Sequence, residues 1–98
     1  MTLKLRDPSL LKTQCLIDGQ WLAADAGATI DVNNPATGEL LVSVPKMGKA
    51  ETQRSIAAGE RAFVLWKNKT AEQRASILYN WFELLMQNQE DLARIMTA

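Results

Sequence analysis

The chain has 98 residues, which allows one domain and no more, and 47% of them are hydrophobic. Eleven basic and eleven acidic residues give a net charge of zero, without a basic stripe or an acidic tail. This balance argues against nucleic-acid binding of the kind that depends on a basic surface. No apolar run is long enough for a signal peptide or a membrane span, and one cysteine cannot form an intramolecular disulfide, so we expect a cytoplasmic protein with no membrane partner.

Residues 1–13 form a predicted N-terminal arm. Asp7 followed by Pro8 is typical of the start of a helical turn, because aspartate caps the turn and proline fits its first position. Leu10 and Leu11 could dock that turn. Two interpretations stay open, a segment that packs on a neighbouring part of the protein and a partly ordered tail, and for an isolated chain we expect the tail.

Residues 14–47 form a predicted antiparallel β unit that begins with a tight hairpin. Asp18 and Gly19 tolerate positive φ angles, and apolar residues flank them on both sides. The predicted cross-strand pairs are Ile17 with Gln20 and Leu16 with Trp21. Further along, residues 29–32 alternate like a short strand, the segment Asn34-Pro35-Ala36-Thr37-Gly38 is typical of a turn, and residues 39–44 resume strand character before Pro45 limits further pairing.

Residues 48–98 form a predicted helical segment of two to three amphipathic helices, so the fold class is α+β. The first helix should run from about Lys49 to Trp66, and Thr70 with Gln73 fits a capping box that starts a second helix. The second helix carries a strong apolar stripe formed by Ile77, Leu78, Trp81, Leu84 and Leu85. Phe82 lies off this stripe and indicates a second contact surface. A third helical pattern near Asn88 still runs at Ala98, which is typical of a chain truncated at its C-terminus.

The residues show no catalytic site and no cofactor-binding site. Histidine is absent, so catalytic histidine arrangements and histidine-bearing metal motifs are excluded, and the five glycines stand singly rather than in a phosphate-binding loop. Cys15 lies in a predicted strand without a local base to activate its thiol, which favours a structural cysteine. We expect Glu72, Glu83, Glu90 and Asp91 to lie on a solvated face. We expect the three tryptophans to pack in a core or an interface.

The order of several short motifs resembles the opening of aldehyde dehydrogenases. Leu16-Ile17-Asp18-Gly19-Gln20-Trp21, followed by Asn34-Pro35-Ala36-Thr37-Gly38, is similar to the family's "I-x-G-x-W … N-P-A-T-G". The likeness continues through Val44-Pro45-Lys46-Met47-Gly48, Arg74-Ala75-Ser76-Ile77-Leu78 and Asp91-Leu92-Ala93-Arg94-Ile95-Met96-Thr97, so it covers essentially the whole chain. Within the family, these motif sequences most resemble those of bacterial enzymes of the succinate-semialdehyde type.

The resemblance implies that the chain is the N-terminal part of a nucleotide-binding domain, in a parent enzyme that oxidises an aldehyde with NAD or NADP. It implies that the catalytic cysteine, the catalytic glutamate and the dinucleotide contacts all lie beyond residue 98, so this chain alone should be inactive. It also implies one possible metal ligand, the main-chain carbonyl of Asn33, in a monovalent-cation site completed by absent segments.

Two functions follow from these observations. The first is a scaffold segment whose partner is the remainder of the parent enzyme, a homo-oligomer, and which self-associates through exposed helix faces when that remainder is missing. The alternative is a free-standing α+β module that binds another protein through its helical face.

Overall fold

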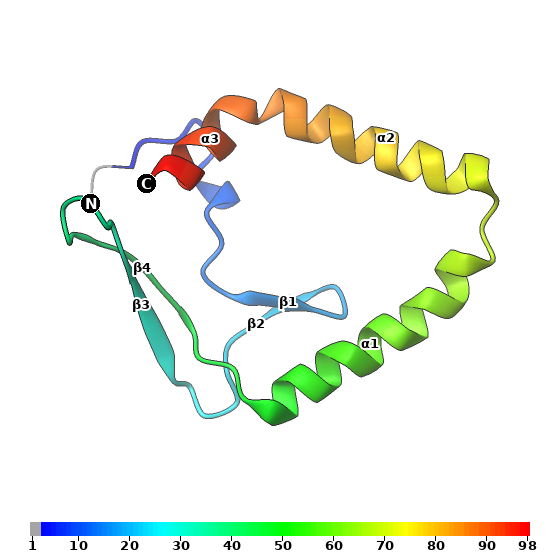
Figure 1. Ribbon diagram of the computed structural model, residues 1–98, viewed down its shortest axis with the longest axis horizontal. Helices are drawn as coiled ribbons and strands as arrows, with labels where there is room; N and C mark the ends of the chain where they lie inside the picture. Colours follow the sequence, from blue (N-terminus) through cyan, green and yellow to red (C-terminus); the bar gives the residue numbers. More distant parts are fainter. Residues whose placement is uncertain (1–2) are drawn as a thin grey trace.

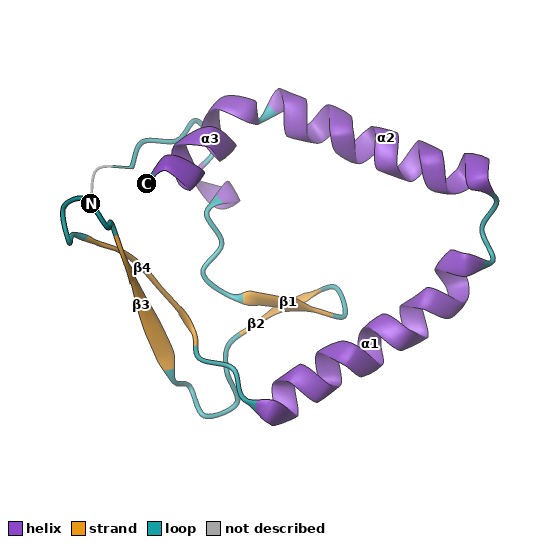
Figure 2. Ribbon diagram, viewed as in Figure 1, coloured by secondary structure: helices purple, strands orange, loops and turns teal. Residues whose placement is uncertain are grey.

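The computed structural model describes residues 3–98, and it confirms the α+β class (Figures 1 and 2). The elements in chain order are the 3-10 turn η1 (Pro8–Leu10), β1 (Cys15–Ile17), β2 (Gln20–Leu22), β3 (Thr29–Asn33), β4 (Leu40–Pro45), α1 (Lys49–Lys67), α2 (Ala71–Gln87) and α3 (Gln89–Thr97).

The hairpin β1–β2 has the predicted turn and the predicted register. Asp18 and Gly19 adopt φ angles of 52° and 74°, which suit a two-residue hairpin turn because its backbone twist matches that of the strands. The cross-strand partners are Leu16 with Trp21 and Ile17 with Gln20.

The second hairpin, β3–β4, is separate from the first. Its strands pair from Thr29 opposite Pro45 to Asn33 opposite Leu40, with an irregularity between Val32 and Asn33. The turn closes where the N–H of Gly38 donates to the carbonyl of Asn34 at 2.7 Å. The predicted antiparallel β unit thus consists, within residues 3–98, of two separate two-stranded sheets.

The three helices lie close to their predicted bounds. α2 begins with a complete capping box, in which the Thr70 hydroxyl accepts from the N–H of Gln73 at 3.1 Å and the Gln73 side chain accepts from the N–H of Thr70 at 2.9 Å. None of the helices within residues 3–98 is both long enough and apolar enough to cross a bilayer.

The N-terminal arm is tied to the far end of the chain, so the expectation of a partly ordered tail is wrong for residues 3–11. Asp7 caps η1 by accepting from the N–H of Ser9 at 3.0 Å, as predicted. The backbone N–H groups of Arg6 and Asp7 donate to the carboxylate of Asp91 in α3. The segment therefore packs on a neighbouring element, because a carboxylate remote in sequence satisfies its backbone donors.

The elements trace an open triangle in Figure 1, with α1 and α2 as two of its sides and α1 packed against β1. The radius of gyration is 16.6 Å, whereas a compact chain of this length has about 13 Å. The accessible surface is 7717 Å², against about 5,600 Å² for a compact protein of this mass. Among the described residues only Ala24 and Ala58 are buried apolar residues, so the helices have no core of their own to cover.

Candidate functional site

Asn33, the expected metal ligand, lies at the end of β3 beside the turn that joins the two strands. Its side-chain amide donates to the carbonyl of Gly38 at 3.2 Å, and its backbone pairs opposite Leu40. This hydrogen bond closes the Asn33–Gly38 turn across five residues. The side chain is thus engaged within the hairpin, and the main-chain carbonyl is the only atom of Asn33 that the resemblance assigns to a cation.

Cys15 opens β1 and is half-buried opposite Leu22. It starts a strand, so no helix N-terminus stabilises a thiolate there. The chain contains no histidine that could act as its base. The position supports the interpretation of Cys15 as a structural residue.

The acidic residues divide into two groups. Glu72, Glu83 and Glu90 are exposed, as expected for a solvated helix face. Asp91 is only 4% exposed, so the expectation that it lies on that face is wrong. The backbone N–H groups of Arg6 and then Asp7 hold the pKa of the Asp91 carboxyl below its ordinary value of 3.8, because they stabilise its charged form.

Glu51 is a second buried carboxylate, and the sequence analysis missed it. It lies in the first turn of α1, is 7% exposed, and accepts from the backbone N–H of Asp25 at 3.4 Å. Arg54 strengthens the same contact through a 2.7 Å ion pair with the Asp25 side chain. An acidic residue in a first helical turn favours the helix N-terminus, and that was the available sequence signal.

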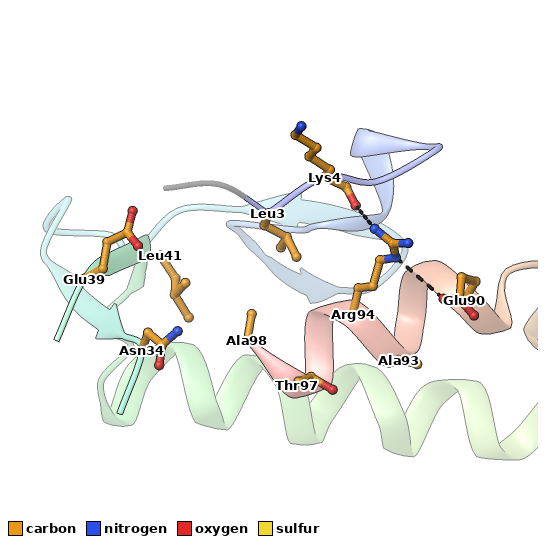
Figure 3. A pocket seen from close by; sticks show the side chains of 10 residues that line it. All are labelled: Leu3, Lys4, Asn34, Glu39, Leu41, Glu90, Ala93, Arg94, Thr97 and Ala98. Carbon is orange, nitrogen blue, oxygen red and sulfur yellow. Dashed lines mark hydrogen bonds and ion pairs between the residues drawn. The ribbon is translucent and has the colours of Figure 1, made fainter. Parts of the chain in front are cut away.

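A groove of about 510 Å³ lies between the arm, the turn that follows β3 and the C-terminal half of α3 (Figure 3). Its charged lining residues are Lys4, Glu39, Glu90 and Arg94. The figure shows Arg94 between the carbonyl of Lys4 and the side chain of Glu90, at 3.3 and 3.7 Å. The groove's charges are thus partly paired with one another, and its lining includes neither a cysteine nor a histidine that could act as a nucleophile or base.

Most of the exposed large hydrophobic residues in the described part of the chain lie on α1 and α2, and together we call them the helix surface. Tyr79 and Phe82 pack as a tilted ring pair 5.8 Å apart on one side of α2, away from the predicted stripe. The large hydrophobic residues of the helix surface, all at least 44% exposed, are Ile56, Phe63, Val64, Leu65, Ile77, Leu78, Tyr79, Trp81, Phe82, Leu84, Leu85 and Met86.

No cluster of three or more metal-ligating side chains occurs within residues 3–98.

The tryptophans do not form a core within this chain. Trp81 is 61% exposed and belongs to the helix surface. Trp21 is 43% exposed, with the Lys12 ammonium group 5.1 Å from its ring centre, and Trp66 is half-buried. A helix that is apolar around most of its circumference is typical of one that is covered on more than one side. The arrangement therefore offers binding surface rather than catalytic chemistry.

The sequence profile of the aldehyde dehydrogenase family matches residues 21–98, and the chain belongs to that family. It is 55% identical over 96 residues to the 3-sulfolactaldehyde dehydrogenase of Pseudomonas putida, 53% over 95 residues to the glutarate-semialdehyde dehydrogenase of Pseudomonas aeruginosa, and 54% over 95 residues to the NADP(+) succinate-semialdehyde dehydrogenase of Escherichia coli. These matches take in 97 to 98% of this chain and 20% of each relative.

A solved structure gives the same result. The crystal structure of an NADP-dependent enzyme from E. coli superimposes with a TM-score of 0.93 and 54% identity, over 96% of this chain and 20% of that one. The chain therefore spans about a fifth of the length of the curated relatives it matches. The fold is that of the N-terminal part of an aldehyde dehydrogenase, as the motif order predicts.

Proposed function

We propose that this chain is the N-terminal scaffold segment of an NAD(P)-dependent aldehyde dehydrogenase that oxidises succinate semialdehyde, or a similar aldehyde, to the acid. The observation that carries the proposal is the close likeness, in sequence and in structure, to one fifth of much longer enzymes. The three relatives named above act, by their names, on aldehydes that also carry an acidic group. That shared feature favours an aldehyde with an anionic end as the substrate.

We further propose that the chain is inactive on its own. Oxidation of an aldehyde through a thioester needs an activated thiolate and donors that stabilise an oxyanion. Cys15 is half-buried at the start of a strand, and the resemblance places the family's catalytic cysteine and glutamate beyond residue 98. The isolated glycines do not form a dinucleotide cradle, because α1 follows the single Gly48 rather than a glycine-rich loop. We expect the NAD or NADP contacts to lie in downstream sequence.

Two smaller assignments go with this proposal. The main-chain carbonyl of Asn33 is the one atom of the chain that we propose as a ligand, within a monovalent-cation site whose other ligands lie elsewhere in the parent enzyme. The lone cysteine suits a reducing compartment, and we propose the cytoplasm.

The partner that we propose for the helix surface is the remainder of the parent enzyme, which we expect to be a homo-oligomer. The chain exposes about 2,000 Å² more surface than a compact protein of its mass. This excess exceeds the roughly 800 Å² that each partner contributes to a standard protein interface. Without its partner, the chain should self-associate through the same surface.

The alternative is a free-standing module that binds another protein. The exposed Tyr79–Phe82 pair favours it, because aromatic residues are enriched in protein interfaces. The two functions differ in what covers the helix surface, which is the remainder of the parent enzyme in the first case and a separate protein in the second. A scaffold segment acquires activity when the chain is continued, whereas an interaction module does not.

The test is aldehyde-dependent reduction of NAD and NADP with succinate semialdehyde. It compares the 98-residue chain with a version continued into its downstream sequence, and it includes Cys15→Ser in the longer version as a matched control. We expect activity only in the longer version, and we expect Cys15→Ser to retain it. Activity in the 98-residue chain would contradict the proposed inactivity. Loss of activity in Cys15→Ser, with the fold of the variant unchanged by circular dichroism, would assign the thiol of Cys15 a part in the reaction. A longer version inactive with every aldehyde tested would refute the scaffold proposal.

A further inference from the structure

One buried carboxylate joins the N-terminal arm to α3. Asp91 Oδ1 accepts from the N–H of Arg6 at 2.9 Å, and Oδ2 accepts from the N–H of Asp7 at 2.9 Å. The donors lie 85 and 84 positions away in the sequence. Both oxygens of one side chain are thus used to hold two consecutive backbone groups of another segment.

This contact joins the first and the last segments of the triangle described above. α1 packs on β1, and α2 contacts α3, whereas α1 and α2 diverge from their short connection at residues 68–70 (Figure 1). The arm and α3 are therefore the two ends of an open series of elements, and they lie near each other in Figure 1. The side chain of Asp91 joins them. Arg94 adds a weaker tie, since its Nη1 donates to the carbonyl of Lys4 at 3.3 Å.

We propose that the two hydrogen bonds accepted by Asp91, which we call the clasp, hold residues 3–11, which we call the strap, against α3. When the clasp is lost, the strap should separate from α3 as a unit. Residues 3–11 belong to no strand, and Arg6 and Asp7 are exposed, so water can take the place of the carboxylate when these two backbone N–H groups lose it. The linking residues Thr13 and Gln14 are exposed, and Lys12 contacts Trp21 on the hairpin rather than α3, so the link does not hold the strap against α3. This inference does not depend on the enzymatic proposal.

The charges around the clasp keep it closed near neutral pH. The charges of Arg6 on the arm and Arg94 on α3 favour the ionised carboxylate of Asp91, and Lys4 and Glu90 line the same pocket. The carboxylate of Asp7 is used locally, because its Oδ1 accepts from the N–H and the hydroxyl of Ser9. Since the pKa of Asp91 is lower in the folded chain, its contribution is complete above its ordinary value of 3.8 and is lost only as the pH falls further.

Hydrogen exchange read by mass spectrometry tests the clasp. Asp91→Ala removes both acceptors, and Asp91→Asn removes the charge and places an amide donor against one backbone N–H. The matched control is Glu90→Gln at the neighbouring position, whose side chain is 73% exposed. We expect exchange at Arg6 and Asp7 to accelerate by about tenfold or more in both Asp91 variants, with residues 49–67 and the control unchanged.

Two results would overturn the proposal. One is unchanged exchange in residues 3–11 of the Asp91 variants, and the other is equal acceleration in α1, which would make Asp91 a support of the whole fold. If a variant does not fold, an NMR titration of the unaltered chain still tests the proposal. The amide proton shift of Arg6 and the side-chain carboxyl carbon shift of Asp91, followed by NMR, should titrate together with a midpoint below 3.8. Separate midpoints, or no titration, would exclude the clasp.

Discussion

Replacing Trp81 by alanine measures whether α2 is covered. The residue is 61% exposed. A buried tryptophan covers roughly 150 to 250 Å², so the chain itself shields only about 60 to 100 Å² of Trp81. At about 25 cal/mol per Å², that shielding stabilises by about 2 kcal/mol. Alanine returns about 0.5 kcal/mol through its helix propensity. We therefore expect Trp81→Ala to lower the free energy of unfolding by about 1 to 2 kcal/mol in the 98-residue chain. In a protein that buries α2, the loss should be about 3 to 5 kcal/mol.

The assay is chemical denaturation followed by circular dichroism, on the 98-residue chain and on the chain continued downstream, at several protein concentrations. Ala58→Leu is the matched control, because Ala58 is 8% exposed where α1 faces the first hairpin, and overpacking there should cost about 1 to 3 kcal/mol in both versions. A loss above about 3 kcal/mol for Trp81→Ala in the short chain, independent of concentration, would refute the reasoning, because α2 would then have a partner within this chain. Equal losses in both versions would show that nothing downstream covers α2.

Two further predictions concern local structure. Thr70→Ala should destabilise the chain by about 1 kcal/mol, because it removes the acceptor for the N–H of Gln73, whereas Thr70→Ser should be nearly neutral; thermal unfolding of both variants checks this. Gly19→Ala should cost about 1 to 2 kcal/mol, since Gly19 has φ of +74°, whereas Gly59→Ala in α1, where an added Cβ meets no atom within 4 Å, should stabilise by about 0.5 to 1 kcal/mol. Denaturation midpoints that move in the same direction for both glycine variants would contradict the backbone argument.

The sequence predicted the features that depend on neighbouring residues. Asp18 and Gly19 determine the turn of the first hairpin, and a two-residue turn leaves one register for the strands on either side, so the pairing of Leu16 with Trp21 followed. The capping box at Thr70 was equally readable, because both of its hydrogen bonds lie within four residues. The family was also predictable, because it follows from the order of several short motifs along the chain.

Contacts between distant segments were not predictable in the same way. Asp91 has the sequence surroundings of an exposed helix residue, and only the arm, more than 80 positions away, buries it. Glu51 is similar, since its partner Asp25 lies in a loop. The division of the β unit into two sheets also depends on where strands meet in space. The Asn33 carbonyl stays a prediction, because its significance depends on ligands outside this chain.

The placement of the clasp has a consequence for the order of folding. Hairpin turns close in about 1 to 10 μs and helical turns form faster still, because their contacts join residues close in the chain. The contact between Asp91 and the arm instead closes a loop of more than 80 residues, and the entropy of that closure grows with loop length. The hairpins and helices should therefore form first and independently, and the joining of the two ends should be the slowest step and the first to reverse.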